Sequence, residues 1–350
     1  MTSHPSSAAA LELIRRGTVI PAHPLALTPE RTLDQRRQRA LSRYYIDAGV
    51  GGIAVGVHTT QFAIRAHGMF AEVLEVTAQA SREWTDRPIA LVAGIIGDTA
   101  QATAEARVAR SLGYHAALLN VASWKGQPED AILDHCRAVA EVMPVIGFAL
   151  LPEVGGFHLS YQFWHSFAQL DNVIAIKMAP FNRYRTHEIV RAVVDARAED
   201  RITLYTGNDD HIVVDLLQPF EVMRDGHPVT VHVTGGLLGH WSVWTRSAVT
   251  QFEQLSAVRG APIPPALLGL DSAVTDSNGA IYDAAHDLAG CIPGCLEVLR
   301  RQGFVDSVRC LNPDEVLSPG QYEEIDRVYA TYPHLNDDRF VAEHLETWLS

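Results

Sequence analysis

Asn172-Val-Ile-Ala-Ile-Lys-Met-Ala-Pro180 is a short apolar run with a single lysine, Lys177, near its end. A run of this length and composition predicts a strand that is buried on both faces. An ammonium group in such a strand is costly unless it is paired or its pKa falls. A desolvated lysine with a lowered pKa is a nucleophile suited to imine formation with a carbonyl substrate. The alternative is a structural lysine that reaches solvent from the strand end or pairs with a carboxylate.

Lysine is rare in this chain. Of 28 basic residues, only Lys125 and Lys177 are lysines, so arginine supplies nearly all of the other cations. The formal net charge of −13 argues against nucleic acid and anionic membranes as main partners. No apolar run approaches the roughly 20 residues of a membrane span, and residues 1–10 lack the pattern of a secretory signal. These features predict a cytoplasmic globular enzyme.

Cysteine and histidine usage gives no metal-binding pattern. Four cysteines in 350 residues predict free, mostly buried thiols in a reducing compartment. Cys291 and Cys295 are four residues apart, but no second Cys/His pair lies close to them in the sequence. The histidines are scattered without the paired spacing of a zinc site. We therefore expect no metal.

Seven further apolar runs accompany the Lys177 segment. Their starts lie about 27 to 37 residues apart, the length of one strand–helix unit. Amphipathic stretches fill the gaps, and Gly49 offers a helix stop after the first of them. Eight such units predict a (β/α)8 TIM barrel. A doubly wound sheet is the competitor, but Pro21-Ala22-His23-Pro24 is not the glycine-rich turn that it usually carries. The predicted strands are residues 18–22, 52–56, 89–94, 116–121, 144–149, 173–177, 202–206 and 229–234.

The last part of the chain is predicted to be helical. We expect helices at about residues 240–256, 278–303, 319–332 and 337–348. One of them completes the barrel, and the others form an extension. The predicted division is therefore a barrel with a short N-terminal segment over residues 1–256 and a C-terminal helical extension, packed on the barrel, over residues 257–350.

The strand ends are the expected place for chemistry, because active sites of such barrels lie at the C-terminal face. Lys177 falls on this rim. The other residues at or just after strand ends include His58, Thr59, Thr60, Trp124, Phe148, Gly207, Asn208, Asp209, Asp210, Gly235, Gly236 and His240.

The ordered motifs resemble the dihydrodipicolinate synthase / N-acetylneuraminate lyase family of class I, pyruvate-type aldolases, from about Val19 to Tyr332. The resemblance implies that Lys177 forms a covalent imine with a 2-oxo acid and that no separate cofactor is needed. It also implies that Thr59 and Thr60 bind the substrate carboxylate, and that the protein is a homo-oligomer, a dimer or tetramer. The motifs are residues 47–56, Asp171-Asn-Val-Ile-Ala-Ile-Lys177, Thr206-Gly-Asn-Asp-Asp210, residues 290–299 and Leu317-Ser318.

The chain departs from the family pattern at its proton relay. The family's fifth strand ends in a tyrosine, and here Phe148 stands in its place without an ionisable or hydrogen-bonding group. The arginine that synthases use for a second carboxylate is also missing, and Glu153 follows Pro152 instead. Ser123-Trp124 replaces a tyrosine pair after the fourth strand. These departures argue against true dihydrodipicolinate synthase activity.

Other rim residues are the candidates for the remaining roles. His58 is the first candidate for acid and base, because the pKa of a histidine lies near neutral pH, and His240 is the second. Trp124 and Phe148 would make an apolar pocket wall. Gly207, Asn208 and Gly236 complete the expected substrate-binding set. Asn208, Asp209 and Asp210 could hold substrate hydroxyls, or Asp209 could cap the following helix.

The leading hypothesis is a Schiff-base-forming lyase of the aldolase type that acts on pyruvate or another 2-oxo acid through Lys177. An aldehyde is a further candidate substrate. One alternative is a 2-oxo acid dehydratase or decarboxylase on the same fold. The other is a ligand-binding homologue without turnover, for which the loss of the tyrosine at Phe148 is the main argument.

Overall fold

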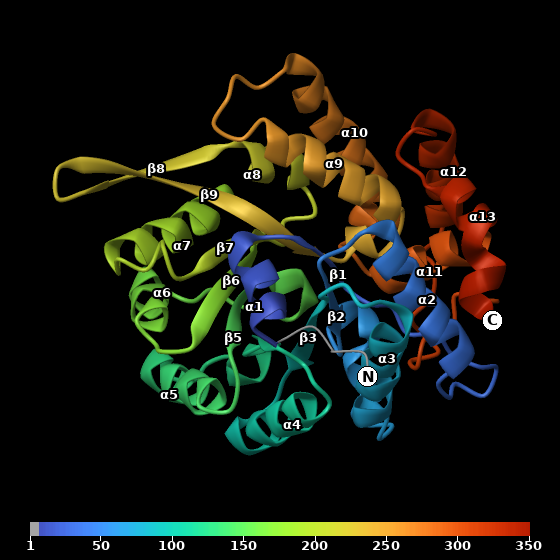
Figure 1. Cartoon of the computed structure of the whole chain (residues 1–350), viewed down its shortest axis with the longest axis horizontal. Helices are drawn as coiled ribbons and strands as arrows, with labels where there is room; N and C mark the ends of the chain where they lie inside the picture. The colour runs from blue at the N-terminus through green and yellow to red at the C-terminus, as the bar shows by residue number, and fades with distance from the viewer. Residues whose placement is uncertain (1–6) are drawn as a thin grey trace.

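Eight parallel strands form a nearly closed barrel in the computed structural model of the chain, which describes residues 7–350 (Figure 1). The ring follows the order β1-β9-β7-β6-β5-β4-β3-β2. It closes between its two ends through a parallel bridge from Ala22 to Ala54. The predicted TIM barrel is therefore confirmed. The strands are β1 (Val19–Pro21), β2 (Gly52–Val55), β3 (Ala90–Ile95), β4 (Ala116–Leu119), β5 (Val145–Leu150), β6 (Val173–Ala179), β7 (Thr203–Thr206) and β9 (His227–Leu238).

Helices surround the barrel and continue beyond its last strand. Local capping fixes several of their ends: Asp34 accepts a hydrogen bond from Arg37 N at the start of α2, and Gly49 ends that helix with φ 101°. Within residues 7–350, no helix is long and apolar enough to cross a membrane. The helices are α1 (Ser7–Arg16), α2 (Gln35–Ala48), α3 (Phe70–Trp84), α4 (Thr99–Ser111), α5 (Glu129–Ala140), α6 (Tyr161–Ala168), α7 (Arg183–Asp195), α8 (Ile212–Leu217), α9 (Thr245–Ala257), α10 (Pro265–Ile281), α11 (Cys291–Arg301), α12 (Gln321–Thr331) and α13 (Asp338–Leu349).

Helix α1 closes the N-terminal end of the barrel, where it lies across the strands (Figure 1). Its Ala10 and Ile14 are buried in the same apolar cluster as the inward-facing barrel residues. The Tyr205 hydroxyl donates to Ile14 O (2.9 Å), and the Thr203 hydroxyl donates to Arg15 O (2.7 Å). Because this end is filled, a substrate can enter the barrel only at the C-terminal ends of the strands.

The eighth barrel strand differs from its prediction. Residues 227–232 of β9 pair antiparallel with β8 (Pro219–Arg224), and barrel pairing starts only at Val233. The hairpin turns at Asp225-Gly226, both at positive φ, which is a typical hairpin signal. The hairpin projects from the barrel at the left of Figure 1. The predicted strand 229–234 lies within β9 but ends four residues too early, so Gly236 lies inside the barrel strand instead of beyond its end.

The helix predicted over residues 278–303 is also wrong as one element. It is interrupted between Ile281 and Cys291, where Asp283 adopts the left-handed conformation with φ 59°. The buried Asp283 carboxylate stabilises this break because it accepts bonds from Gly290 N (3.0 Å) and from the Ser318 hydroxyl. The break positions Tyr282, the residue just before Asp283, at the C-terminal mouth of the barrel.

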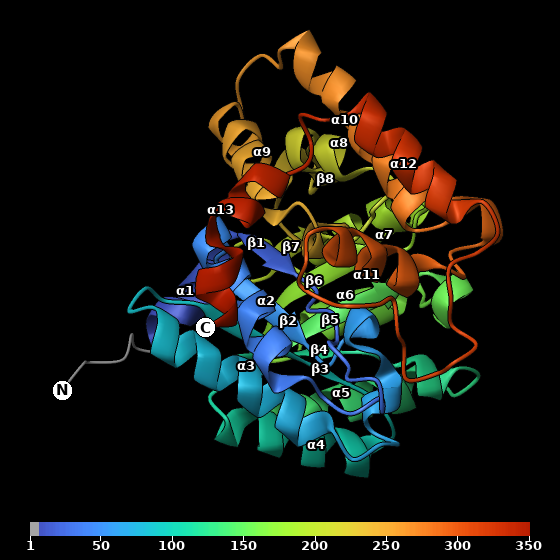
Figure 2. The same ribbon diagram turned by 90° about the vertical axis from the view of Figure 1, so that its right-hand side faces the viewer.

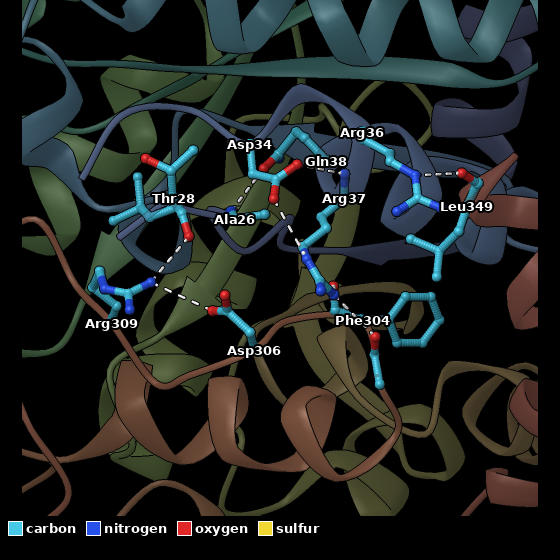
Figure 3. A network of polar contacts seen from close by, with 12 residues as sticks. Ala26, Thr28, Asp34, Arg36, Arg37, Gln38, Phe304, Asp306, Arg309 and Leu349 are labelled. Atoms are coloured by element: carbon cyan, nitrogen blue, oxygen red, sulfur yellow. Dashed lines mark hydrogen bonds and ion pairs between the residues drawn. The ribbon is translucent and has the colours of Figure 1, made fainter. Parts of the chain in front are cut away.

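The C-terminal helices are held against α2. Figure 2 shows α13 alongside α2. Arg37 donates to Phe304 O (2.8 Å) and Arg36 donates to Leu349 O (2.7 Å), so two adjacent arginines bind two distant parts of the C-terminal region (Figure 3). The Trp348 indole donates to Asp47 Oδ2 (2.7 Å). These contacts join the extension to the barrel that it partly covers.

Candidate functional site

A cavity of about 60 Å³ lies at the C-terminal end of the barrel. Side chains from the strand ends form its floor, and the segment between α10 and α11 forms part of its cover. Most of its lining is apolar, and Lys177 is its only lysine or arginine. The lining residues are Ala22, Val57, His58, Thr59, Leu118, Phe148, Leu150, Leu151, Val154, Lys177, Ala179, Phe181, Gly207, Asp209, Gly239, Tyr282, Leu288 and Cys291.

Lys177 lies on β6 with only 8% of its surface exposed. Phe148 is its register partner on β5, and Lys177 Nζ lies 4.4 Å from the centre of the Phe148 ring. On the other side, a Cβ at Gly207 would collide with Lys177 Cε, so glycine there leaves room for the lysine. Burial lowers the pKa of Lys177, while the nearby Asp209 opposes that shift. The amine is thus more readily deprotonated than an exposed lysine.

Asp209 shares the cavity with Lys177 and is 6% exposed. Its Oδ1 accepts a hydrogen bond from His240 N (3.1 Å). Burial raises the pKa of Asp209, and the charge of Lys177 acts in the opposite direction. In the described part of the chain no direct ion pair joins the two side chains, although both line the cavity.

The loop that carries Asp209 is held by a buried polar network below it. Asn208 donates to Asp215 Oδ2 (2.9 Å) and accepts from Phe181 N (3.1 Å). The Thr206 hydroxyl also donates to Asp215 Oδ2 (2.6 Å), and Arg183 pairs with the same carboxylate. Asn208 therefore supports the loop from beneath and does not line the cavity.

His58 lies in the cavity wall, where it was expected. Its Nδ1 is 3.9 Å from Cys291 Sγ, and its ring packs near Phe62. Burial, together with the charge of Lys177, lowers the pKa of His58 to about 4. The pKa of the Cys291 thiol is raised by burial. The two groups are therefore a neutral imidazole and a neutral thiol at physiological pH.

Two hydroxyl groups of the cavity lining, those of Thr59 and Tyr282, lie beside Gly239. A Cβ at Gly239 would collide with the Tyr282 hydroxyl and would lie 3.4 Å from Thr59 Oγ1. Burial, and then the charge of Asp209, raises the pKa of Tyr282 well above 10, so its phenol stays protonated. Thr60, by contrast, uses its hydroxyl within the fold, because it donates to His23 O (2.7 Å) and accepts from Gly56 N (3.0 Å).

The structure brings His58, Thr59, Phe148, Lys177 and Gly207 together around the cavity, while four other expected residues do not line it. Two of the four, Thr60 and Asn208, have the structural contacts given above. Trp124 donates to Gly97 O (3.1 Å) and packs on His135. Gly236 lies in the barrel wall, where a Cβ would meet the Trp241 ring.

Among the cavity residues that sequence reasoning missed, three come from the C-terminal region: Tyr282, Leu288 and Cys291. They lie more than 100 residues after Lys177, in a stretch that was expected to be one regular helix. Two successive residues with positive φ, Asp287 and Leu288, help to break that helix, and Gly290 and Pro293 are the local sequence signals that could have predicted a new helix start there. Asp209 was noticed only as a cap or a hydroxyl ligand, because its distance from Lys177 in the chain hides their shared cavity.

No metal site is apparent between residues 7 and 350, where no group of three or more His, Cys, Asp or Glu side chains could hold an ion. All four cysteines are free and buried.

The fold and the site together are those of a (β/α)8 barrel protein with one buried lysine at its C-terminal mouth. The chain belongs to the dihydrodipicolinate synthetase family, which it matches over residues 16–221, more than half of its length. An N-acetylneuraminate lyase of Citrobacter koseri is 26% identical over 200 residues, which cover 55% of this chain and 64% of that protein. A 4-hydroxy-tetrahydrodipicolinate synthase of Halorhodospira halophila is 25% identical over 182 residues, 51% of this chain and 57% of the relative. The chain thus spans less than two thirds of these curated relatives.

Solved structures share the fold over a larger part of the chain. A dihydrodipicolinate synthase from Acinetobacter baumannii, complexed with pyruvate, gives a TM-score of 0.72 at 17% identity and covers 90% of this chain and 98% of its own. CdNal from Clostridium difficile, in complex with mannosamine, gives a TM-score of 0.72 at 16% identity, and the match covers 90% of this chain and 99% of CdNal. At these identities the likeness extends to the fold alone.

Proposed function

We propose that this protein is a class I lyase that forms a Schiff base between Lys177 and pyruvate or another 2-oxo acid. The observation that carries the proposal is a single lysine, buried in the barrel cavity, whose pKa burial lowers. An amine whose pKa burial lowers to about 8, in a small and mostly apolar cavity, loses its proton more readily than an exposed lysine and is then suited to attack on a carbonyl carbon. The family relationship supports the same reading, because its named members include N-acetylneuraminate lyases.

The 2-oxo acid carboxylate is assigned to the Thr59 and Tyr282 hydroxyls. Both are neutral donors that lie beside Gly239 in the cavity lining. Hydrogen bonds from neutral donors to a carboxylate are charge-assisted and do not need a cation. Tyr282 is suited to this role because its raised pKa keeps the proton on its oxygen.

The rest of the substrate is assigned an apolar character. Leu150, Leu151, Val154, Phe181 and Leu288 line the cavity beyond Lys177. Since Asp209 is acidic and no arginine lines the cavity in residues 7–350, a second carboxylate would be repelled and left unpaired. This favours a monocarboxylate with a small apolar or aromatic second half over the substrate of a dihydrodipicolinate synthase.

Borohydride reduction in the presence of pyruvate, read by intact mass, tests the proposal. The wild-type protein should gain the mass of one reduced pyruvate adduct, and Lys177→Ala should gain none. Lys125→Ala is the matched control, because Lys125 is the other lysine of the chain and is exposed. If a panel of 2-oxo acids leaves the wild-type mass unchanged, the lyase proposal is wrong.

The same experiment bears on the two alternatives. Adduct formation followed by loss of water or carbon dioxide from the 2-oxo acid would indicate a dehydratase or decarboxylase. A bound but unreacted 2-oxo acid would indicate a ligand-binding homologue, for which Phe148 in place of tyrosine is the supporting observation. Homo-oligomerisation stays a prediction of the resemblance, and a cytoplasmic location stays a prediction from composition and cysteine usage.

A further inference from the structure

We propose that Asp209 is the acid and base that moves protons around the Lys177 imine, in the place of the missing tyrosine. This inference rests on the proposed lyase function and deepens it. It assigns a catalytic role to a residue of the loop after β7 instead of to the β5 position that Phe148 occupies.

Imine chemistry needs a group that both gives and takes a proton. The lysine must lose a proton to attack, the carbinolamine oxygen must gain protons to leave as water, and C3 must lose a proton to form the enamine. Phe148 can do none of these, because its ring has no exchangeable proton. The carrier must therefore be another group that lines the cavity with Lys177.

The cavity holds five side chains that could exchange a proton besides Lys177, and Asp209 fits best. The thiol of Cys291 and the phenol of Tyr282 hold their protons too tightly, and the hydroxyl of Thr59 is less acidic still. The His58 imidazole holds its proton too weakly, since its pKa falls to about 4. Asp209 is the group whose pKa moves toward neutral pH from its usual value, which favours transfer in both directions.

The geometry of the carboxylate fits this use. Oδ1 is fixed by the backbone N–H of His240 at 3.1 Å, while Oδ2 has no hydrogen-bond partner among the described residues. One oxygen thus positions the group and the other is free for the substrate. Asp209 and Lys177 both line the cavity, and no direct ion pair joins them among residues 7–350, so a carbonyl group bound in the cavity beside Lys177 can receive the proton from Asp209. The titratable groups around Asp209 are Lys177, Asp210, Tyr282, Cys291 and Cys295.

The protons balance when Asp209 acts at each step. Its carboxylate takes a proton from the Lys177 ammonium, and the neutral amine attacks C2 of the 2-oxo acid. The carboxylic acid then protonates the C2 oxygen, takes a second proton from the nitrogen and returns it to the hydroxyl group, which leaves as water. The product is a protonated imine and an ionised Asp209. That carboxylate next removes a proton from C3, which gives the neutral enamine and a protonated Asp209.

Exchange of the pyruvate methyl protons in D2O, followed by NMR, tests the inference with the full-length protein. Asp209→Asn keeps the size of the side chain and an oxygen that can accept from His240 N, but it removes the titrating group. We expect a borohydride adduct with pyruvate at equilibrium and methyl exchange that is at least about 100-fold slower than in the wild type. Asp210→Asn is the matched control, because Asp210 is the neighbouring, exposed carboxylate, and it should exchange at the wild-type rate within about threefold.

Asp209→Glu separates catalysis from a structural role. The longer side chain still carries a carboxyl group, so we expect it to exchange faster than the Asn variant, which a purely structural role would not produce. Exchange by Asp209→Asn within threefold of the wild type would overturn the inference, and so would a Glu variant no faster than the Asn variant. Loss of exchange in His58→Asn but not in Asp209→Asn would assign the relay to His58. An absent adduct in the wild type would instead overturn the lyase proposal itself.

Discussion

Lys177 Nζ lies 4.4 Å from the centre of the Phe148 ring, which is carried by its register partner on the neighbouring strand. An aromatic face attracts a cation, and this attraction is worth about 0.5–2 kcal/mol. The position that carries a tyrosine in the resembled family therefore keeps a ring against the lysine but loses the hydroxyl. Phe148 can stabilise the ammonium and the protonated imine electrostatically while taking no part in proton transfer.

Replacing Phe148 with leucine should weaken the imine. At a pH above the pKa of Lys177, where the imine but not the free amine is a cation, the loss of the ring removes about 0.5–2 kcal/mol of attraction from the imine alone, which corresponds to an imine equilibrium constant about 2- to 30-fold lower. The pKa of Lys177 should fall further. The measurement is the pyruvate concentration that gives half-maximal borohydride trapping. Phe148→Tyr, which keeps the ring, is the control, and equal trapping by the Leu and Tyr variants would contradict the prediction.

Lys177 and Asp209 should be energetically coupled in folding. Each single variant, Lys177→Met or Asp209→Asn, leaves one buried charge without its counterpart, whereas the double variant leaves neither. The double variant should therefore be more stable than the two single changes predict by addition, with an interaction of about 0.5–3 kcal/mol. Urea denaturation of the four proteins gives this value, and strict additivity would show that the two groups do not interact.

The stability of Lys177→Met should also depend on pH. Burial raises the pKa of Asp209 in the folded protein, and the removal of Lys177 takes away the charge that opposes this. A group whose pKa is raised by folding stabilises the fold fully below its unfolded pKa and loses that contribution as pH rises through the folded pKa. The melting temperature of Lys177→Met should therefore fall between pH 5 and pH 8 by more than that of the Lys177→Met/Asp209→Asn double variant.

Tyr282→Phe should impair binding of the 2-oxo acid more than imine chemistry. A hydrogen bond to a charged group contributes about 1.5–3 kcal/mol, so KM for the 2-oxo acid should rise by about tenfold or more with a smaller change in kcat. Because the phenol stays protonated, the KM ratio should be constant across neutral pH. Tyr184→Phe is the control, since Tyr184 is 86% exposed on α7. An unchanged KM would remove Tyr282 from the carboxylate site.

Gly207→Ala should displace the lysine. The added methyl group would collide with Lys177 Cε, so the side chain must leave its position over Phe148. We expect imine formation at least about tenfold slower, because a misplaced nucleophile loses its attack geometry, with the fold retained by circular dichroism. Gly269→Ala in α10 is the control, because a Cβ there meets no atom within 4 Å.

Much of the fold could be predicted from local patterns. Seven of the eight barrel strands were predicted to within two residues at each end, because buried parallel strands are short apolar runs between helices. The bounds of the eighth strand were wrong because β9 belongs to two sheets. Its residues 227–232 pair with β8 in the hairpin, and the part that pairs in the barrel follows without a break. Local composition does not reveal which partner a continuous strand has at each position.

The sequence alone determined the barrel, the family and the place of Lys177 at the end of a buried strand, since strand periodicity and motif order are local properties of the chain. Only the tertiary structure decided what surrounds that lysine. It brought Asp209, from the loop after β7, and Tyr282, from the C-terminal region, to one cavity. It also showed that Thr60 and Asn208 make structural hydrogen bonds and do not line that cavity. The physical reason is that burial and the proximity of charges arise from contacts between segments as far apart in the chain as His58 and Cys291, and these contacts set which groups can exchange a proton.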